Sequence, residues 1–280
     1  MKREPAGKVQ ACRFCRFPTI INLAMAVSFP GFQAVLYRLG FFVRTLACVP
    51  LFVKSRSVSS RVLVMQIYFT FVQALGLCAM LALGTGAALS VIAFPFLQLL
   101  SSQQLLYPLL IAVVTRELGP LLTAFIVIAR SATAIATETA GMVINHEVEA
   151  YVSVGVDPVE HLAVPRLLGV TVSLLLLNIY FSVFALAGSF AVVGFFHAVQ
   201  ADVFFGGLIR SLTIADLATA AFKSVAFGIV ISVTAIGEGL AVERSSTEVP
   251  VAGLRAVTRS FAICIAFNII LSAMHYTVLA

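Results

Sequence analysis

Long apolar stretches dominate the chain, and short clusters of glycine, proline and charged residues separate them. A helix needs about 20 predominantly apolar residues to cross the hydrocarbon core of a bilayer. The pattern therefore predicts an all-α, polytopic membrane protein, with five transmembrane helices over residues 64–89, 105–140, 165–193, 217–240 and 259–280. The second of these is longer than one straight crossing requires, so its last turns are expected to project beyond the hydrocarbon.

The apolar stretch of residues 31–53 has a different pattern. Drawn as a helix, it has one apolar face and an opposite face that carries polar residues, which is typical of a helix lying in the membrane interface. Crossing the membrane instead would bury Arg38 and Arg44 at a cost of up to ~2.5–3.5 kcal/mol each. We therefore expect an N-terminal interfacial segment, residues 1–60, followed by a five-helix domain, residues 61–280.

Composition and charge agree with a membrane protein. Of the 280 residues, 61% are hydrophobic and only 11% are charged, against about 25% charged in a typical soluble domain. Ten of the eighteen Lys and Arg residues precede Val62, four more lie in or beside the connections 142–165 and 241–260, and Arg210 alone lies on the other side. The positive-inside rule then places the N-terminus in the cytoplasm and the C-terminus on the far side. The net charge of +6 follows from this topology and does not indicate a nucleic-acid partner.

Two adjacent charges, Arg116 and Glu117, lie inside the second predicted span. Neighbouring side chains do not share a helix face, so each needs a separate partner or a wet cavity. Pro120 lacks an N–H and clashes with the carbonyl four residues back, which predicts a kink with polar backbone exposed. Lys223 is a candidate partner for Glu117, and Asn268 is another polar group at similar depth. Either this group locks helices together, or it lines a polar cavity for an amphiphilic substrate.

Small residues recur at four-residue spacing further along the same span, at Ala132, Ala136 and Ala140. Such a ladder lets helix backbones approach closely. It serves either packing within the chain or a seam between two copies.

The connection between the second and third spans encodes its own structure. Asn145 is a possible N-cap, and Glu147 and Glu149 favour the positive end of a short helix. Gly155 is placed to end that helix, and Asp157, followed by proline, is placed to cap the next one. This acidic helix is either a docking element for a partner protein or a solvated connector.

No motif for catalysis or metal binding accompanies these features. The sequence contains no G-x-x-x-x-G-K-[ST] phosphate loop, no H-E-x-x-H and no G-x-S-x-G. We therefore predict that the chain is not an enzyme, that it does not hydrolyse ATP itself, and that it holds no catalytic residue or metal. Cys12 and Cys15 form a lone C-x-x-C, which is a weak signal for a metal or redox site.

Several motifs in order resemble one known family. The segments "RELGPLLTAFIVIARSATAIATETAGM" and "EVEAYVSVGVDPVEHLAVPRLLG", followed later by "FKSVAFG" and "VAGLRAVTRS", are similar to the MlaE-type permeases. These permeases are the membrane subunits of lipid ABC transporters that work with MCE-domain proteins. The resemblance covers about residues 60–280.

The resemblance implies partners and a location. It implies a homodimer in the bacterial inner membrane, with a cytoplasmic N-terminus and a periplasmic C-terminus. It further implies that the dimer exchanges phospholipid or a similar lipid with a periplasmic MCE-domain protein, in support of outer-membrane lipid asymmetry. The ATP and Mg²⁺ would be held by a separate cytoplasmic ATPase, so this chain itself needs no cofactor.

The resemblance also implies site residues. A substrate cavity between the two copies would be lined by Arg116, Glu117, Lys223 and Asn268. Some relatives carry an acid at the last of these positions, which argues against a charge network that includes Asn268. The helix that couples to the ATPase would lie at about residues 145–155 and include Glu147, Val148, Glu149, Tyr151 and Val152.

Two functions from other classes remain open. An ion-coupled secondary transporter would use Arg116, Glu117 and Lys223 as a relay, and internal inverted repeats would support it. The sequence shows no convincing internal symmetry. A membrane-embedded lipid-modifying enzyme would need a nucleophile or a metal constellation, and none is found.

Overall fold

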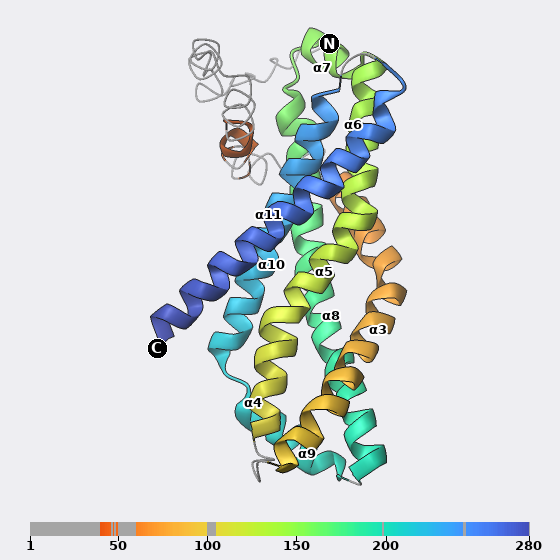
Figure 1. Ribbon diagram of the computed structural model, residues 1–280. Coiled ribbons are helices and arrows are strands. Elements are labelled where there is room, and N and C mark those ends of the chain that lie inside the picture. Colours follow the sequence, from red (N-terminus) through yellow and green to blue (C-terminus); the bar gives the residue numbers. More distant parts are fainter. Residues whose placement is uncertain are drawn as a thin grey trace, which may run out of the picture.

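The computed structural model describes residues 40–45, 47, 49, 60–99, 105–197, 199–242 and 245–279, and it forms an elongated bundle of helices (Figure 1). The elements in chain order are α3 (Ser60–Leu99), α4 (Leu106–Leu110), the π-helical η2 (Ile111–Leu118), α5 (Gly119–Val127), the π-helical η3 (Ile128–Ala132), α6 (Thr133–Ile144), α7 (Glu147–Ser153), the π-helical η4 (Val159–Ala163), α8 (Val164–His197), α9 (Ala201–Ser211), α10 (Ile214–Leu240) and α11 (Glu248–Leu279).

Five helical stretches in this part of the chain are long and apolar enough to cross a membrane. They are Leu63–Gln98, Leu106–Ile144, His161–Phe196, Ile214–Leu240 and Glu248–Met274. The predicted all-α fold with five transmembrane helices is therefore confirmed. The first helix continues ten residues beyond its predicted end at residue 89, through Pro95, to Leu99.

The second span runs as one rod from α4 to α6, and its backbone leaves α-helical geometry where the proline predicted a disturbance. The π-helical segment η2 ends directly before Gly119 and Pro120, and the Gly119 N–H bonds to the carbonyl of Val114, five residues back. Because proline cannot donate an N–H and its ring crowds the preceding turn, a wider turn relieves the conflict.

Helices α3 and α8 form the tightest contact of the bundle. A Cβ atom on Gly86 of α3 would overlap the carbonyl of Ala185, and one on Gly188 of α8 would overlap the carbonyl of Leu83. The hydroxyls of Ser90 and Ser189 form a hydrogen bond across the same contact. Small residues thus let the two backbones touch, as is common between helices in lipid.

The small-residue ladder of α6 packs within the chain. Ala132, Ala136 and Ala140 are each fully buried. A Cβ on Gly239 of α10 would meet α6 at less than 3 Å, and Gly253 of α11 lies against two of its threonines. The interpretation as internal packing is confirmed, and this face leaves no room for a seam with a second copy.

The last transmembrane helix begins earlier than predicted. We expected a connection over residues 241–260, but α11 starts at Glu248. We took the charged residues of this stretch as a sign of a polar connection, but two of them are paired. The Nη2 atom of Arg255 lies 3.8 Å from Oε2 of Glu248, and Arg259 pairs with Glu238 of α10. Pairing neutralises these side chains, so they are compatible with a helix.

Helix α9 was not predicted. It lies at the opposite end of the bundle from α7 (Figure 1). Phe204 and Leu208 are buried, while Val203 and Ile209 are exposed, so α9 has one face on the bundle and one face outward. Its 11 residues are too few to cross a membrane.

The predicted interfacial helix is only partly described. Residues 40–45, 47 and 49 are helical, and the Nη2 atom of Arg44 lies 2.6 Å from Oδ2 of Asp157. The other residues of the range 31–53 lie outside the described residues, and the interfacial position stays a prediction.

Candidate functional site

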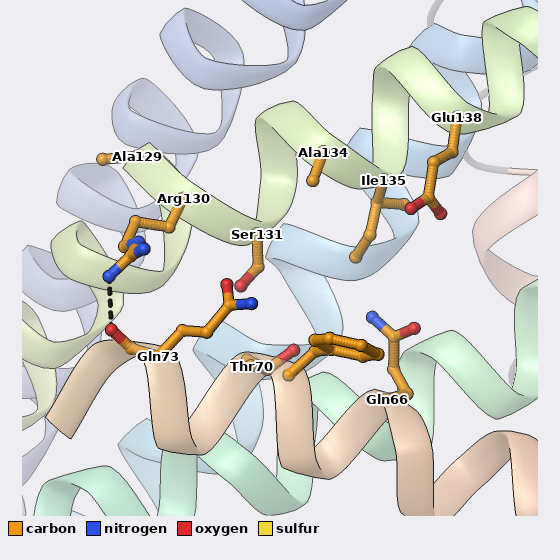
Figure 2. Close-up of a pocket in the computed structure, with 10 residues that line it drawn as sticks. Gln66, Thr70, Gln73, Ala129, Arg130, Ser131, Ala134, Ile135 and Glu138 are labelled. Atoms are coloured by element: carbon orange, nitrogen blue, oxygen red, sulfur yellow. Dashed lines mark hydrogen bonds between the residues drawn. The ribbon is translucent and has the colours of Figure 1, made fainter.

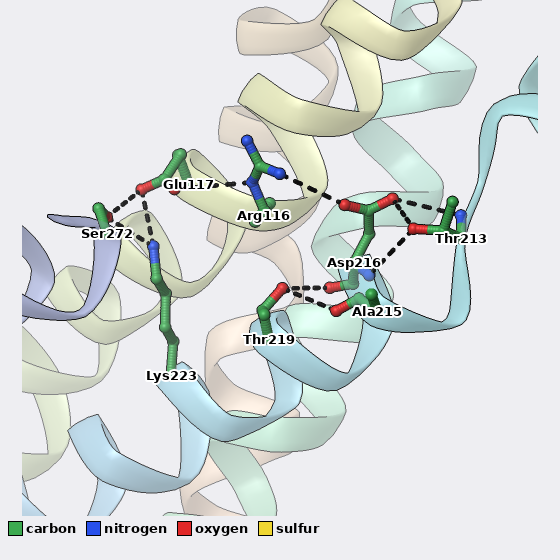
Figure 3. A network of polar contacts seen from close by, with 8 residues as sticks. All are labelled: Arg116, Glu117, Thr213, Ala215, Asp216, Thr219, Lys223 and Ser272. Atoms are coloured by element: carbon green, nitrogen blue, oxygen red, sulfur yellow. Dashed lines mark hydrogen bonds and ion pairs between the residues drawn. The ribbon is translucent and has the colours of Figure 1, made fainter. Parts of the chain in front are cut away.

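A cluster of polar side chains joins η2, α10 and α11 in the half of the bundle nearer α9 (Figure 3). The side chain of Lys223, on α10, is 3% exposed. Its ammonium group donates to Oε2 of Glu117 at 2.7 Å and to the hydroxyl of Ser272 at 2.8 Å. The Ser272 hydroxyl donates to the same carboxylate oxygen at 2.7 Å. The predicted Glu117–Lys223 pair is therefore confirmed, and the carboxylate binds two helices at once.

Arg116 finds its carboxylate at the start of α10. Its Nη1 atom lies 3.5 Å from Oδ1 of Asp216. Asp216 also belongs to a capping box, because its N–H donates to the Thr213 hydroxyl and its carboxylate accepts from the Thr213 N–H at 3.2 Å. The prediction that Arg116 and Glu117 need separate partners is confirmed, but Asp216 was not predicted. Asp216 thus both stabilises the N-terminus of α10 and compensates the charge of Arg116.

The two neighbours also approach each other, which regular helix geometry did not lead us to expect. The Nε atom of Arg116 lies 3.8 Å from Oε1 of Glu117. Both residues belong to the π-helical η2. A wider turn rotates successive residues by a smaller angle, so their side chains diverge less than in an α-helix.

Among the described residues, no hydrogen bond joins Asn268 to this cluster. Its Oδ1 atom is buried and has no hydrogen-bond partner in the part of the chain that the structure describes. Ser272, one turn further along α11, takes the position in the cluster that we predicted for Asn268. Sequence reasoning missed Ser272, and its only signal was the four-residue spacing from Asn268. That Arg116, Glu117, Lys223 and Asn268 line a substrate cavity stays a prediction.

The cluster joins helices through paired charges. It contains two acids and two bases, so its formal charges balance. Within the described ranges no group of three or more His, Cys, Asp and Glu side chains is placed to hold a metal ion. Breaking a buried ion pair by removing one partner costs far more than the pair contributes net. The two ion pairs therefore hold η2 and α10 in one fixed register.

At the other end of the bundle, α7 forms a short acidic helix. His146, just before it, has a left-handed backbone with φ 60°, and its Nδ1 lies 3.0 Å from Oε2 of Glu149. Asn145 ends α6 and does not cap α7, which corrects the predicted N-cap. Glu147 and Glu149 are exposed, in keeping with a carboxylate preference at a helix N-terminus.

The turn after α7 follows the predicted pattern. Gly155 has φ 82°, and its N–H donates to the Val152 carbonyl at 3.0 Å, while the Val156 N–H donates to the Tyr151 carbonyl at 2.9 Å. This is a Schellman motif, which favours glycine at the left-handed position. Asp157 then accepts from the Val159 N–H at 2.9 Å and so caps the next helix. The orientation of α7 is therefore set by local hydrogen bonds.

Comparison with known proteins shows the family of the chain. Residues 63–274 match the family model described as Permease MlaE. The chain belongs to this permease family. The matched range contains all residues of the charged cluster and all of α7, so both features lie inside the part that defines the family.

Individual relatives are similar over different shares of the chain. A probable ABC transporter permease protein of Rickettsia typhi is 24% identical over 213 residues, which are 76% of this chain and 82% of the relative. One from Synechocystis is 26% identical over 162 residues, 58% of this chain and 62% of the relative. The chloroplast protein named trigalactosyldiacylglycerol 1, from Arabidopsis thaliana, is 26% identical over 126 residues, 45% of this chain and 36% of the plant protein. The permease is thus a multi-pass membrane protein of the ABC transporter class.

Proposed function

We propose that this permease moves phospholipid or a similar lipid, as the membrane subunit of an ABC transporter in the bacterial inner membrane. In this proposal a separate cytoplasmic ATPase, which holds ATP and Mg²⁺, supplies the energy, and a periplasmic MCE-domain protein exchanges lipid with the permease. Family membership and the names of the bacterial relatives support the transporter class. The plant relative, whose name contains that of a galactolipid, supports a lipid as the substrate.

The single observation that carries the proposal is α7. A rigid helix with outward carboxylates, set between two membrane spans, is the surface that an ATPase subunit needs for contact. The side chains of Val152 and Val154 are 61% and 80% exposed, beside the acids of the first turn. Exposed apolar groups rimmed by charge are typical of a protein interface. The α7 end of the bundle is then cytoplasmic, and the α9 end is periplasmic.

The ATPase contact would use the face of α7 that its own bundle leaves uncovered. Glu147 and Glu149 would meet basic side chains of the ATPase, and Val152 would enter an apolar pocket. Tyr151 would hold the helix in place, because its ring packs against that of His161 with the ring centroids 5.4 Å apart. Val148 is half-buried and would likewise steady the helix.

A homodimer is supported by the position of α11. This helix leaves the bundle toward its C-terminal end (Figure 1), and only 11% of its apolar window is buried. A second copy would cover part of this surface. The charged cluster, which includes Ser272 of α11, would then border a space between the copies, where lipid could pass toward the periplasmic side.

The test is co-purification of the ATPase with the full chain from native membranes. The double variant Glu147→Lys with Glu149→Lys reverses the charge of α7 and is expected to lose the ATPase while the permease remains in the membrane. The control Asp202→Lys, on α9 at the other end, should retain it. An ATPase yield equal in all three proteins would refute the proposed contact.

Family membership sets the ion-coupled secondary transporter aside. The relay predicted for that alternative, Arg116, Glu117 and Lys223, is accounted for by ion pairs with carboxylates of the same chain. Lipid transport by the isolated chain, driven by an ion gradient alone in liposomes, would revive it.

A further inference from the structure

A second polar region lies between α3 and the η3–α6 part of the second span, apart from the charged cluster (Figure 2). It is an open groove of about 400 Å³, within the range of ~300–1,000 Å³ of small-molecule sites. Its α3 wall carries Gln66, Thr70 and Gln73, and its other wall carries Arg130 and Ser131. A surface with this many amide and hydroxyl groups is unusual between two helices that face lipid.

The groove lies in the half of the bundle nearer α7. Arg130 is 14 residues before the end of α6 at Ile144, or about 21 Å along a helix axis at 1.5 Å per residue. Gln66 is six residues from the start of α3, or about 9 Å. Arg116 lies a further 14 residues toward α9. The groove is therefore a separate site, in the half of the bundle nearer the side that we propose to be cytoplasmic.

Arg130 is the group that gives the groove its chemistry. Its guanidinium donates to the backbone carbonyl of Gln73 (Figure 2), and no carboxylate lies within ion-pair distance among the residues the structure describes. Glu138, at the other end of the groove, is paired with Arg166 at 3.1 Å. Arg130 is thus a positive charge in the groove that no carboxylate of the described residues contacts.

We propose that this groove binds the phosphodiester headgroup of a phospholipid from the cytoplasmic leaflet. A guanidinium inside a membrane needs an anionic partner or water, and its planar donors match phosphate oxygens. The amides of Gln66 and Gln73 and the hydroxyls of Thr70 and Ser131 can donate to the remaining phosphate and ester oxygens. Basic pockets between transmembrane helices on the cytoplasmic side are suited to such headgroups.

The surface beside the groove suits the acyl chains. Met65, Tyr68, Phe69 and Val72 of α3 are all large, apolar or aromatic, and at least 41% exposed. A headgroup held at Arg130 would let its chains lie along these side chains in the lipid phase. This assignment rests on the proposed lipid transport and identifies a place where substrate from the inner leaflet would first be held.

The test uses the absence of tryptophan from the 280-residue sequence. Phe69→Trp places a single fluorescent reporter at the groove of the full chain. Phosphatidylglycerol with brominated acyl chains, titrated into the protein in detergent, is expected to quench it with saturation. Arg130→Gln in this background should weaken apparent binding by about tenfold, the effect of one charge-assisted hydrogen bond. Arg130→Lys should retain most of the affinity, and Arg210→Gln, on α9, should change nothing.

Other arms identify what the groove recognises. Brominated diacylglycerol lacks the phosphate and should quench weakly; quenching equal to that by phosphatidylglycerol would overturn the headgroup assignment. Displacement by excess inorganic phosphate would mean that the groove takes soluble phosphate and would overturn it too. Absence of quenching by any lipid would overturn the proposal, because no lipid would then bind beside residue 69.

The outcome is separable from that of the proposed function. ATPase co-purification tests the transporter assignment and does not depend on Arg130. If the ATPase is retained but Arg130→Gln titrates like the parent, only the groove is refuted. Should Arg130→Gln fail to fold, Ser131→Leu fills the groove and keeps the arginine, and it must lower binding for the proposal to hold.

Discussion

Two arginines of the second span, 14 residues apart, meet opposite surroundings. Arg116 faces α10, which supplies Asp216 at 3.5 Å, with the Glu117–Lys223 pair beside it. Arg130 faces α3, which supplies a backbone carbonyl, amides and hydroxyls. The residue type is the same, and the neighbouring helix decides its role. A charge met by a carboxylate holds helices together, whereas a charge met by neutral donors and acceptors is ready for an external anion.

The contrast assigns different tasks to the two halves of the bundle. In the half nearer α9, ion pairs join η2 to α10 and hydrogen bonds through Ser272 extend the cluster to α11. Any rearrangement of these helices during transport must exchange those bonds. In the half nearer α7, the groove can fill and empty without breaking a salt bridge. Substitutions in the first region should therefore change stability most, and those in the second should change lipid affinity.

The largest effect is expected from Lys223→Met. It removes the ammonium group that bonds Oε2 of Glu117 and leaves beside the carboxylate only the Ser272 hydroxyl and Arg116, whose Nε is 3.8 Å from Oε1. Breaking a buried ion pair in this way costs about 3–5 kcal/mol. The midpoint of thermal unfolding of the purified chain in detergent should fall steeply. Arg130→Gln, measured in parallel, should lower the unfolding midpoint far less, because no carboxylate loses its ion-pair partner.

A double variant sharpens this first prediction. Glu117→Leu combined with Lys223→Met removes both charges, and replacing a buried pair with apolar groups is often neutral or stabilising. The double variant should therefore unfold at a higher temperature than Lys223→Met alone. Equal losses in the single and double variants would show that the loss in Lys223→Met does not come from a stranded Glu117 charge.

The second effect has the opposite sign. Asn268→Leu removes the buried Oδ1 atom that has no hydrogen-bond partner among the described residues. Removal of an unsatisfied polar atom should raise stability by about 1–2 kcal/mol, again measured as the unfolding midpoint. If Asn268 serves the substrate, the same variant should lose lipid transport. A loss of stability would mean that this amide is bonded to a second copy.

The sequence predicted those features whose cause is local or very costly to avoid. Apolar runs predicted the five spans, because each run is long enough to cross the hydrocarbon core of a bilayer. Pro120 predicted the disturbed helix, and Gly155 and Asp157 predicted the turn after α7, because each depends on a few neighbouring residues. The Glu117–Lys223 pair was predictable because intramembrane charges must find partners and few exist.

Features that depend on helix register could not be predicted. Ser272 and Asn268 differ by one turn of α11, and only the crossing of α11 over the bundle selects the serine. Asp216 lies in the first turn of α10, and its pairing with Arg116 depends on the position of η2. The groove requires the relative rotation of α3 and η3, about which Gln66 and Gln73 say nothing on their own.

A third effect, smaller than the first two, concerns the start of α10. Thr213→Ala removes the hydroxyl that accepts from the Asp216 N–H and should cost about 1 kcal/mol, as for other N-caps. Because Asp216 also pairs with Arg116, the loss should shrink in an Arg116→Gln background, which a double-mutant cycle of unfolding midpoints measures. Thr219→Ala, a full turn inside the helix, is the matched control. Strictly additive effects would mean that cap and ion pair act independently.

The smallest effect concerns the sign of the groove. Glu138 is the one acid among the residues that line the groove. Arg166 compensates its charge only in part, because the Glu138 side chain is 60% exposed to solvent. Along the helix it is eight residues, or about 12 Å, from Arg130. Glu138→Gln should therefore raise the affinity for phosphatidylglycerol by about twofold, since charges at this separation in wet surroundings interact by a few tenths of a kcal/mol.

The same quenching titration measures this change, with Asp202→Asn on α9 as the control for net charge. Phosphatidylcholine, whose headgroup has no net charge, should gain less than phosphatidylglycerol. An equal gain in affinity for both lipids would point to a change in groove shape. No gain for either lipid would show that the charge of Glu138 does not affect lipid binding. A gain confined to the anionic lipid requires the headgroup to lie between α3 and α6, because Glu138 is too far from the charged cluster near α9 to act on a lipid bound there.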